Sequence, residues 1–114
     1  MTKRERKELA RESRDSRVLD WLSRDEDLWV YIKVAKNPNT SVESLDRLSR
    51  DEYGIVRIGV ARNPNTSVRI LDRLSRDKYE NVRETVARNP KWKAIQEPGL
   101  LDVARRASKW LGII

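Results

Sequence analysis

The stretch DEYGIVRIGVARNPNTSVRILDRLSR, residues 51–76, decides the architecture because the chain repeats it. Residues 25–50, DEDLWVYIKVAKNPNTSVESLDRLSR, align with it without a gap, and a third copy begins at Asp77 and loses the pattern after Pro90. The Asn-Pro dipeptide recurs every 26 residues (63 − 37 and 89 − 63), at Asn37, Asn63 and Asn89. Similarity at a fixed period predicts stacked helical units, each too small to bury its apolar face alone.

Each unit divides at its Asn-Pro dipeptide into two short helices. In the middle copy Val56, Val60 and Ala61 share one face of the first helix. Pro64 cannot continue that helix and disfavours helical geometry at Asn63, so the helix is predicted to end there. The same apolar positions recur in the other copies, as Val30, Val34 and Ala35 and as Val82, Val86 and Ala87.

The second helix of each unit follows the sequence Asn-Thr-Ser-Val. Thr40 and Thr66, or the serines beside them, are candidate N-caps, and Glu43 lies three residues after Thr40 as in a capping box. Apolar residues then recur every third position, at Val42, Leu45 and Leu48 and at Val68, Leu71 and Leu74. This spacing suits a 3₁₀-helix as well as an α-helix.

A stack of such units needs a cap at each end. We therefore interpret residues 1–114 as a single repeat domain, with an N-terminal cap helix (1–17), a half repeat (18–24), three repeats (25–50, 51–76 and 77–94) and a C-terminal cap helix (99–114). The chain ends on apolar residues, which either fold over the last repeat or bind a partner or a second copy: Trp110, Leu111, Ile113 and Ile114.

The chain contains neither cysteine nor histidine. This composition excludes disulfides, thiolate nucleophiles, Ser-His-Asp triads and the usual zinc and iron–sulfur ligands. We expect no catalytic residue, no metal and no cofactor, and hence a protein that is not an enzyme. The N-terminus is too polar for a signal peptide and no apolar run is long enough to span a membrane, so we expect a cytoplasmic protein without a membrane partner.

The formal net charge is +7, which is compatible with nucleic acid or an acidic protein face as partner. The repeat register places Lys36, Arg62 and Arg88 in one column without a local acid, and this column is a candidate contact row. A second column has an aspartate four residues before each arginine, a spacing that usually only solvates a helix face: Arg24, Arg50 and Arg76. Two further arginines precede aspartates at the same spacing, in Arg47–Asp51 and Arg73–Asp77.

Several aromatic side chains stand where the repeat varies, and we take them as candidate partner-binding residues: Trp21, Trp29, Tyr31, Tyr53, Tyr79 and Trp92. Surface tryptophan and tyrosine beside arginine are typical of interface hot spots and of platforms on which bases stack. The alternative is packing within the caps. We expect Arg57 and Arg83 to form salt bridges between repeats with Asp51 and Asp77. We expect the asparagines before proline to bind helix-end carbonyls or the next turn.

The string VRIGVARNPNTSVRILDRLSRD resembles the leucine-rich repeat variant (LRV) family, whose helical-repeat architecture is similar to that of HEAT and armadillo repeats. The resemblance covers about residues 18–90 and implies a right-handed α-solenoid of alternating α- and 3₁₀-helices, an all-α fold. Tyr31 replaces the arginine that Arg57 supplies, and Ser41 and Ser67 replace a frequent proline. Some family members carry an iron–sulfur cluster on N-terminal cysteines, which this chain lacks.

The leading functional prediction is a non-catalytic interaction module that binds a protein partner through rows of surface side chains. The alternative is a nucleic-acid-binding protein that uses the column of Lys36, Arg62 and Arg88 together with the surface aromatics. Salt dependence separates the two, because binding through several phosphates weakens steeply with ionic strength.

Overall fold

The computed structural model describes residues 1–96, and in this part of the chain every regular element is an α-helix. The predicted all-α class is therefore confirmed for these residues. The predicted cap helix 99–114, with Trp110, Leu111, Ile113 and Ile114, lies outside them. The helices are α1 (Lys3–Glu12), α2 (Ser16–Leu22), α3 (Leu28–Lys36), α4 (Val42–Leu48), α5 (Gly54–Arg62), α6 (Val68–Leu74), α7 (Glu80–Arg88) and α8 (Pro90–Gln96).

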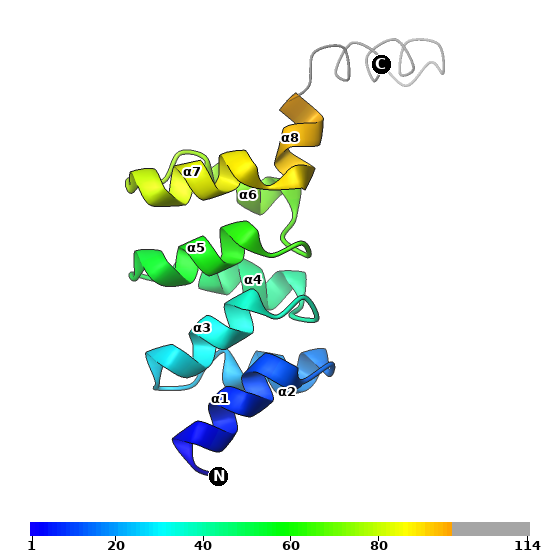
Figure 1. The fold of residues 1–114 in the computed structure, drawn as a ribbon, viewed down its shortest axis with the longest axis vertical. Helices are drawn as coiled ribbons and strands as arrows, with labels where there is room; N and C mark the ends of the chain where they lie inside the picture. The colour runs from blue at the N-terminus through cyan, green and yellow to red at the C-terminus, as the bar shows by residue number, and fades with distance from the viewer. Residues whose placement is uncertain (97–114) are drawn as a thin grey trace, which may run out of the picture.

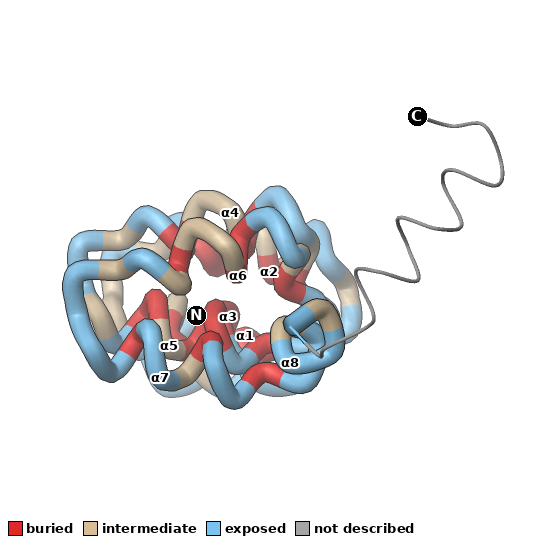
Figure 2. Tube along the Cα trace, turned by 90° about the horizontal axis from the view of Figure 1, so that it is seen from above, coloured by how far each residue is buried: buried red, intermediate tan, exposed pale blue. Residues whose placement is uncertain are grey.

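The helices form two layers (Figure 1, Figure 2). In one layer α1 packs against α3, α3 against α5 and α5 against α7. Helices α2, α4 and α6 form the other layer, and Figure 2 shows the buried residues between the two. The core consists of leucine, valine, isoleucine and alanine side chains from both layers, among them Leu19, Val34, Leu45, Val60, Leu71 and Val86.

The first helix of each unit ends at its Asn-Pro dipeptide, as the sequence predicts. Asn37, Asn63 and Asn89 are the C-cap residues of α3, α5 and α7, and each has an extended backbone conformation. A residue before proline is pushed into this region by the proline ring. The proline therefore turns the chain out of the first layer at the same place in each unit.

Serine, and not threonine, caps the second helix of each unit. Ser41 accepts a hydrogen bond from the backbone N–H of Ser44 at the start of α4 (3.1 Å), and Ser67 has the same role in α6. The predicted capping box of Thr40 and Glu43 is wrong. The Thr40 hydroxyl instead donates to the backbone oxygen of Val34 (2.7 Å), so it joins the end of one helix to the start of the next.

The expectation of 3₁₀-helices in the second layer is also wrong for the described residues. Helices α4 and α6 are α-helical, and the N–H of Leu71 bonds the oxygen of Ser67 four residues earlier (3.0 Å). Bonds that span three residues close the turn just beyond the helix, as from Arg76 N–H to Arg73 O (3.2 Å). The serine cap sets the first turn, and the leucine spacing of three is tolerated within a seven-residue α-helix.

The last unit differs from those before it. Ala35 and Ala61 are completely buried, but the equivalent Ala87 is exposed, because within residues 1–96 no further first-layer helix follows α7. Helix α8 begins directly at Pro90, where Lys-Trp-Lys replaces the Asn-Thr-Ser of the earlier units. The end of the described stack therefore presents a face that is covered in the earlier units.

Candidate interaction surfaces

The buried asparagines connect each unit to the unit before it. The Asn63 side-chain amide donates to the backbone oxygens of Ala35 (2.7 Å) and Asn37 (2.8 Å), and that of Asn89 donates to Ala61 (2.8 Å). The side-chain oxygen of Asn63 accepts from the backbone N–H of Asn65 (2.8 Å). The prediction that these asparagines bind helix-end carbonyls is confirmed. These residues hold the units together and are unavailable to a partner.

Arg57 and Asp77 form a buried ion pair between units. The Arg57 Nε lies 2.7 Å from Asp77 Oδ2, and its Nη1 donates to the backbone oxygen of Asp51 (2.6 Å). Burial alone would raise the pKa of Asp77, but hydrogen bonds from Arg57 and from the backbone of Tyr79, with the charges of Arg57 and Lys78, hold it below its ordinary value. The predicted salt bridge between repeats is thus confirmed for this pair.

The position that Arg57 occupies in α5 holds different side chains, or makes different bonds, in the other units. Arg6 of α1 pairs with Asp25 (2.8 Å), whereas Arg83 donates to the backbone oxygen of Asp77 (2.6 Å) and is exposed. The equivalent residue of α3 is Tyr31, which packs against the core. Burial raises the pKa of the Tyr31 phenol, and the charge of Asp51 raises it further. Tyr31 therefore has a packing role, although its aromatic ring made it a candidate contact.

On the outer face of the second layer, most arginines are paired with aspartates. The predicted pairs within helices are present, as in Asp72–Arg76 (3.0 Å). The pairs expected from Arg47 to Asp51 and from Arg73 to Asp77 are wrong, because Arg73 reaches back to Asp46 of the preceding unit (3.0 Å). Arg47 does the same with Asp20 (3.2 Å). Because these half-buried arginines pair with the preceding unit, they connect neighbouring units. This face therefore has few unpaired cations.

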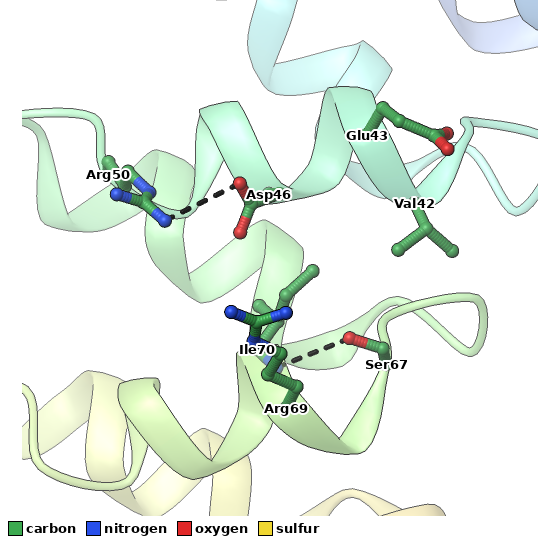
Figure 3. A pocket seen from close by; sticks show the side chains of 7 residues that line it. All are labelled: Val42, Glu43, Asp46, Arg50, Ser67, Arg69 and Ile70. Carbon is green, nitrogen blue, oxygen red and sulfur yellow. Dashed lines mark hydrogen bonds and ion pairs between the residues drawn. The ribbon is translucent and has the colours of Figure 1, made fainter.

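A shallow pocket of about 300 Å³ lies between α4 and α6 on this face (Figure 3). In Figure 3 Asp46 points toward Arg50, and the two are joined at 3.5 Å. The hydrogen bond from Arg73, with the charges of Arg50 and Arg73, keeps the pKa of Asp46 below its ordinary value despite partial burial. The carboxyl group is therefore ionised at neutral pH and is poorly suited to act as a general acid.

The basic column lies at the C-terminal ends of three adjacent helices. Lys36 ends α3, Arg62 ends α5 and Arg88 ends α7, and all three side chains are exposed. Arg62 and Arg88 line one cavity of about 240 Å³ together with Thr85. Among residues 1–96 none of the three cations is in a salt bridge with an acid. In this respect the column differs from Arg24, Arg50 and Arg76.

The candidate aromatics do not form one surface. Trp21 is exposed on α2, in the second layer, and Trp29 is exposed in the first turn of α3. Trp92 is partly buried and packs against the core. Tyr53 and Tyr79 are brought together, since both line one groove. Tyr31, whose pKa is raised mainly by burial, lies near enough to Tyr53 for the Tyr53 phenol to contribute to that raised pKa.

This groove, which we call the tyrosine groove, lies between the N-terminal halves of α5 and α7 and has a volume of about 620 Å³. Tyr53 is 47 % exposed, Ile55 47 % and Tyr79 49 %. Partly buried Ile58 contributes to its apolar lining, and Glu52 and Glu80 lie at its edge. Large apolar side chains that remain half exposed side by side mark an interaction surface more often than scattered ones do.

The sequence interpretation missed Ile55, Ile58, Glu52 and Glu80, because it considered only aromatic and basic side chains. A signal was present at Ile55, which occupies the same register position as Trp29 and Asn81. Because this position is tryptophan, isoleucine and asparagine in successive units, core packing does not determine its residue type. Large apolar residues at such a position predict a contact surface.

Further findings limit the chemistry available in the described part of the chain. Residues 1–96 contain no cluster of acidic side chains arranged to hold a metal ion. In the same residues no helix has both the length and the apolar character needed to cross a bilayer. The candidate surfaces in this part of the chain are the tyrosine groove, the basic column and a cavity of about 180 Å³ between α1 and α3, which is lined by Arg4, Lys7, Glu8, Arg11 and Lys33.

Over residues 1–96, paired helices joined by buried asparagines define an all-helical fold of repeat character. The family model of the leucine rich repeat variant matches residues 56–78, and this confirms the resemblance over that stretch. Neither a curated protein nor a solved structure matches the chain.

Proposed function

We propose that this protein is a short right-handed α-solenoid that acts as a non-catalytic scaffold and binds a protein partner in the tyrosine groove. The observation that carries this proposal is the cluster of Tyr53, Ile55 and Tyr79, each about half exposed beside the others. Tyrosine and isoleucine give a large apolar contact area, and tyrosine is enriched among residues that dominate binding energy. The repeat match at residues 56–78 supports a scaffold role.

The groove is also held in a defined shape. The Tyr79 N–H donates to Asp77 Oδ1 (2.9 Å), and the Arg57 guanidinium carbon lies 5.3 Å from the centre of the Tyr79 ring. Arg57 is in turn fixed by its pair with Asp77. A ring that is already ordered loses little conformational entropy on binding. This arrangement favours a surface prepared for a partner.

Affinity enrichment with quantitative mass spectrometry tests the proposal. The bait is the full chain, and the source is a lysate of the cells that make it. We expect proteins enriched by the unaltered chain to be lost with Ile55→Asp and with Tyr79→Ser. They should be retained with Trp21→Ser, a matched control because Trp21 is an exposed aromatic on the other layer. Circular dichroism checks that each variant folds. Equal loss with the control, or no loss with either groove variant, would contradict the proposal.

Nucleic acid binding through the basic column is the second candidate function. The observation that favours it is that Lys36, Arg62 and Arg88 are exposed at the ends of three adjacent helices and make no described salt bridge. Successive cations on adjacent helices are suited to contact successive phosphates. This candidate accounts for the net charge of +7, which the tyrosine groove does not.

Fluorescence anisotropy with short single- and double-stranded DNA and RNA tests this candidate. We expect reversal of Lys36, Arg62 and Arg88 to glutamate to reduce affinity and to lower the salt slope by about one for each phosphate that is no longer neutralised. Reversal of Arg24, Arg50 and Arg76 is the matched control, since either set lowers the charge from +7 to +1 (7 − 6). If both sets reduce affinity equally, the effect belongs to overall charge and the column has no special role.

A further inference from the structure

The edge of the tyrosine groove is acidic although the protein is strongly basic. Glu52 and Glu80 line the groove, and both are exposed. In the part of the chain that the structure describes, neither is in a salt bridge. No arginine or lysine is among the lining residues. The groove therefore has a local charge opposite in sign to the net charge of +7.

The other charged groups near the groove form no salt bridge with Glu52 or Glu80 within residues 1–96. Arg57 is neutralised by Asp77 and is nearly fully buried. The half-buried Asp51 adds a further carboxylate, which accepts the Tyr53 N–H (2.9 Å). Lys78 lies with its Nζ 5.3 Å from the centre of the Tyr79 ring, outside the groove lining. The groove thus combines apolar side chains with two carboxylates that make no salt bridge within residues 1–96, and Lys78 is a cation beside its Tyr79 ring.

We propose that the tyrosine groove binds a basic amphipathic segment of a partner protein, in which apolar side chains are flanked by lysine or arginine. The apolar side chains contact Tyr53, Ile55 and Tyr79, and the flanking cations lie near Glu52 and Glu80. This inference rests on the proposed function and adds the chemistry of the partner. The volume of about 620 Å³ lies within the roughly 300–1,000 Å³ of typical binding sites.

Two designed peptides test the inference against the full chain. One is a labelled amphipathic peptide of leucine, alanine and lysine, and the other has glutamate at each lysine position. We expect the lysine peptide to bind more tightly by anisotropy at physiological salt. The net charge of +7 attracts the glutamate peptide and repels the lysine peptide, so nonspecific attraction predicts the opposite order.

Variants at the groove locate the binding. Glu52→Gln and Glu80→Gln preserve shape, and each is expected to weaken the lysine peptide about two- to fivefold, as expected for an exposed ion pair. Ile55→Asp is expected to abolish binding, because it places a charge on the apolar floor. Glu43→Gln is the matched control, since Glu43 is an exposed glutamate on the other layer.

The outcomes separate this inference from the proposed function. Equal binding of both peptides, lost with Ile55→Asp, overturns the charge complementarity and leaves the groove as a protein-binding site. Binding of neither peptide overturns the inference, while the affinity enrichment decides the scaffold function independently. A dimer in analytical ultracentrifugation that Ile55→Asp dissociates would assign the groove to a second copy of this chain and overturn the partner segment.

Discussion

Arg57 and Asp77 face each other across two units with 7 % and 8 % of their side chains exposed. The guanidinium makes two bonds to the carboxylate, from Nε to Oδ2 (2.7 Å) and from Nη2 to Oδ1 (3.2 Å). Its remaining nitrogen binds the backbone oxygen of Asp51. Each of the three guanidinium nitrogens thus makes a bond, and a buried charge held in this way is stable only while its partner is present. The junction between these two units therefore depends on both members of the pair.

Asp77→Ala should lower the free energy of unfolding by about 3–5 kcal/mol, because it leaves the Arg57 charge buried without a partner. Asp72→Ala should lower it by less than about 1 kcal/mol, because the Asp72–Arg76 pair is exposed. Urea denaturation followed by circular dichroism measures both. Similar losses for the two variants would show that Arg57 is solvated in solution.

Stability should also fall in acid. The pKa values of Asp77 and Asp46 are lowered in the folded protein, so the ionised forms stabilise the fold above the ordinary aspartate pKa of about 3.9. This stabilisation is lost as the pH falls through the lowered values. We expect the free energy of unfolding to decrease below about pH 4. The variant Asp77→Asn should show a shallower decrease, and an unchanged slope would contradict the assignment.

Asn63→Ala should destabilise the protein by about 1–3 kcal/mol, because the buried Ala35 oxygen loses the Asn63 amide and the Asn37 oxygen keeps only the Thr40 N–H (3.1 Å). Asn39→Ala is the control, because the exposed Asn39 amide binds only the Asn37 side chain. Thermal and urea unfolding compare the two. If Asn39→Ala is as harmful as Asn63→Ala, the joint between units is not the source of the effect.

Thr66→Val should destabilise by about 0.5–1.5 kcal/mol, since it removes the bond from the fully buried hydroxyl to Val60 O (2.6 Å) and leaves that oxygen only the Asn63 N–H (3.1 Å). Thr66→Ser keeps the hydroxyl and should lose less stability. Because Ser67 caps α6, Ser67→Ala should cost about 0.5–2 kcal/mol independently. An additive double variant Thr66→Val/Ser67→Ala supports separate roles, whereas strong non-additivity would point to one shared cap.

The sequence predicted most of what depends on backbone chemistry and apolar spacing. Pro64 and its equivalents end the first helices, and the valine and leucine positions form the core. These features are local, or are repeated from unit to unit. The role of Thr40 was not predicted, because threonine and serine are both good caps and only the path of the chain decides between them.

The contact surfaces were harder to predict. Spacing within a helix suggested Arg73–Asp77, but the bond to Asp46 depends on how neighbouring units are placed. Tyr53 and Tyr79 were predicted as contacts and do lie in one groove, whereas Tyr31 and Trp92 pack against the core. Side chains that look alike in the sequence differ in exposure because exposure depends on the neighbouring unit.

The asparagine joints can form in the order in which the chain is synthesised. In each joint the donor belongs to the later unit and the backbone oxygens to the earlier one, as in Asn63 with Ala35 and Asn89 with Ala61. A growing chain therefore completes its joints one at a time, from the N-terminus onward, and never has to reopen one. Duplicating or deleting a whole unit preserves the asparagine donor and the backbone acceptor of each joint. Such a chain can change its length in evolution without redesigning its contacts.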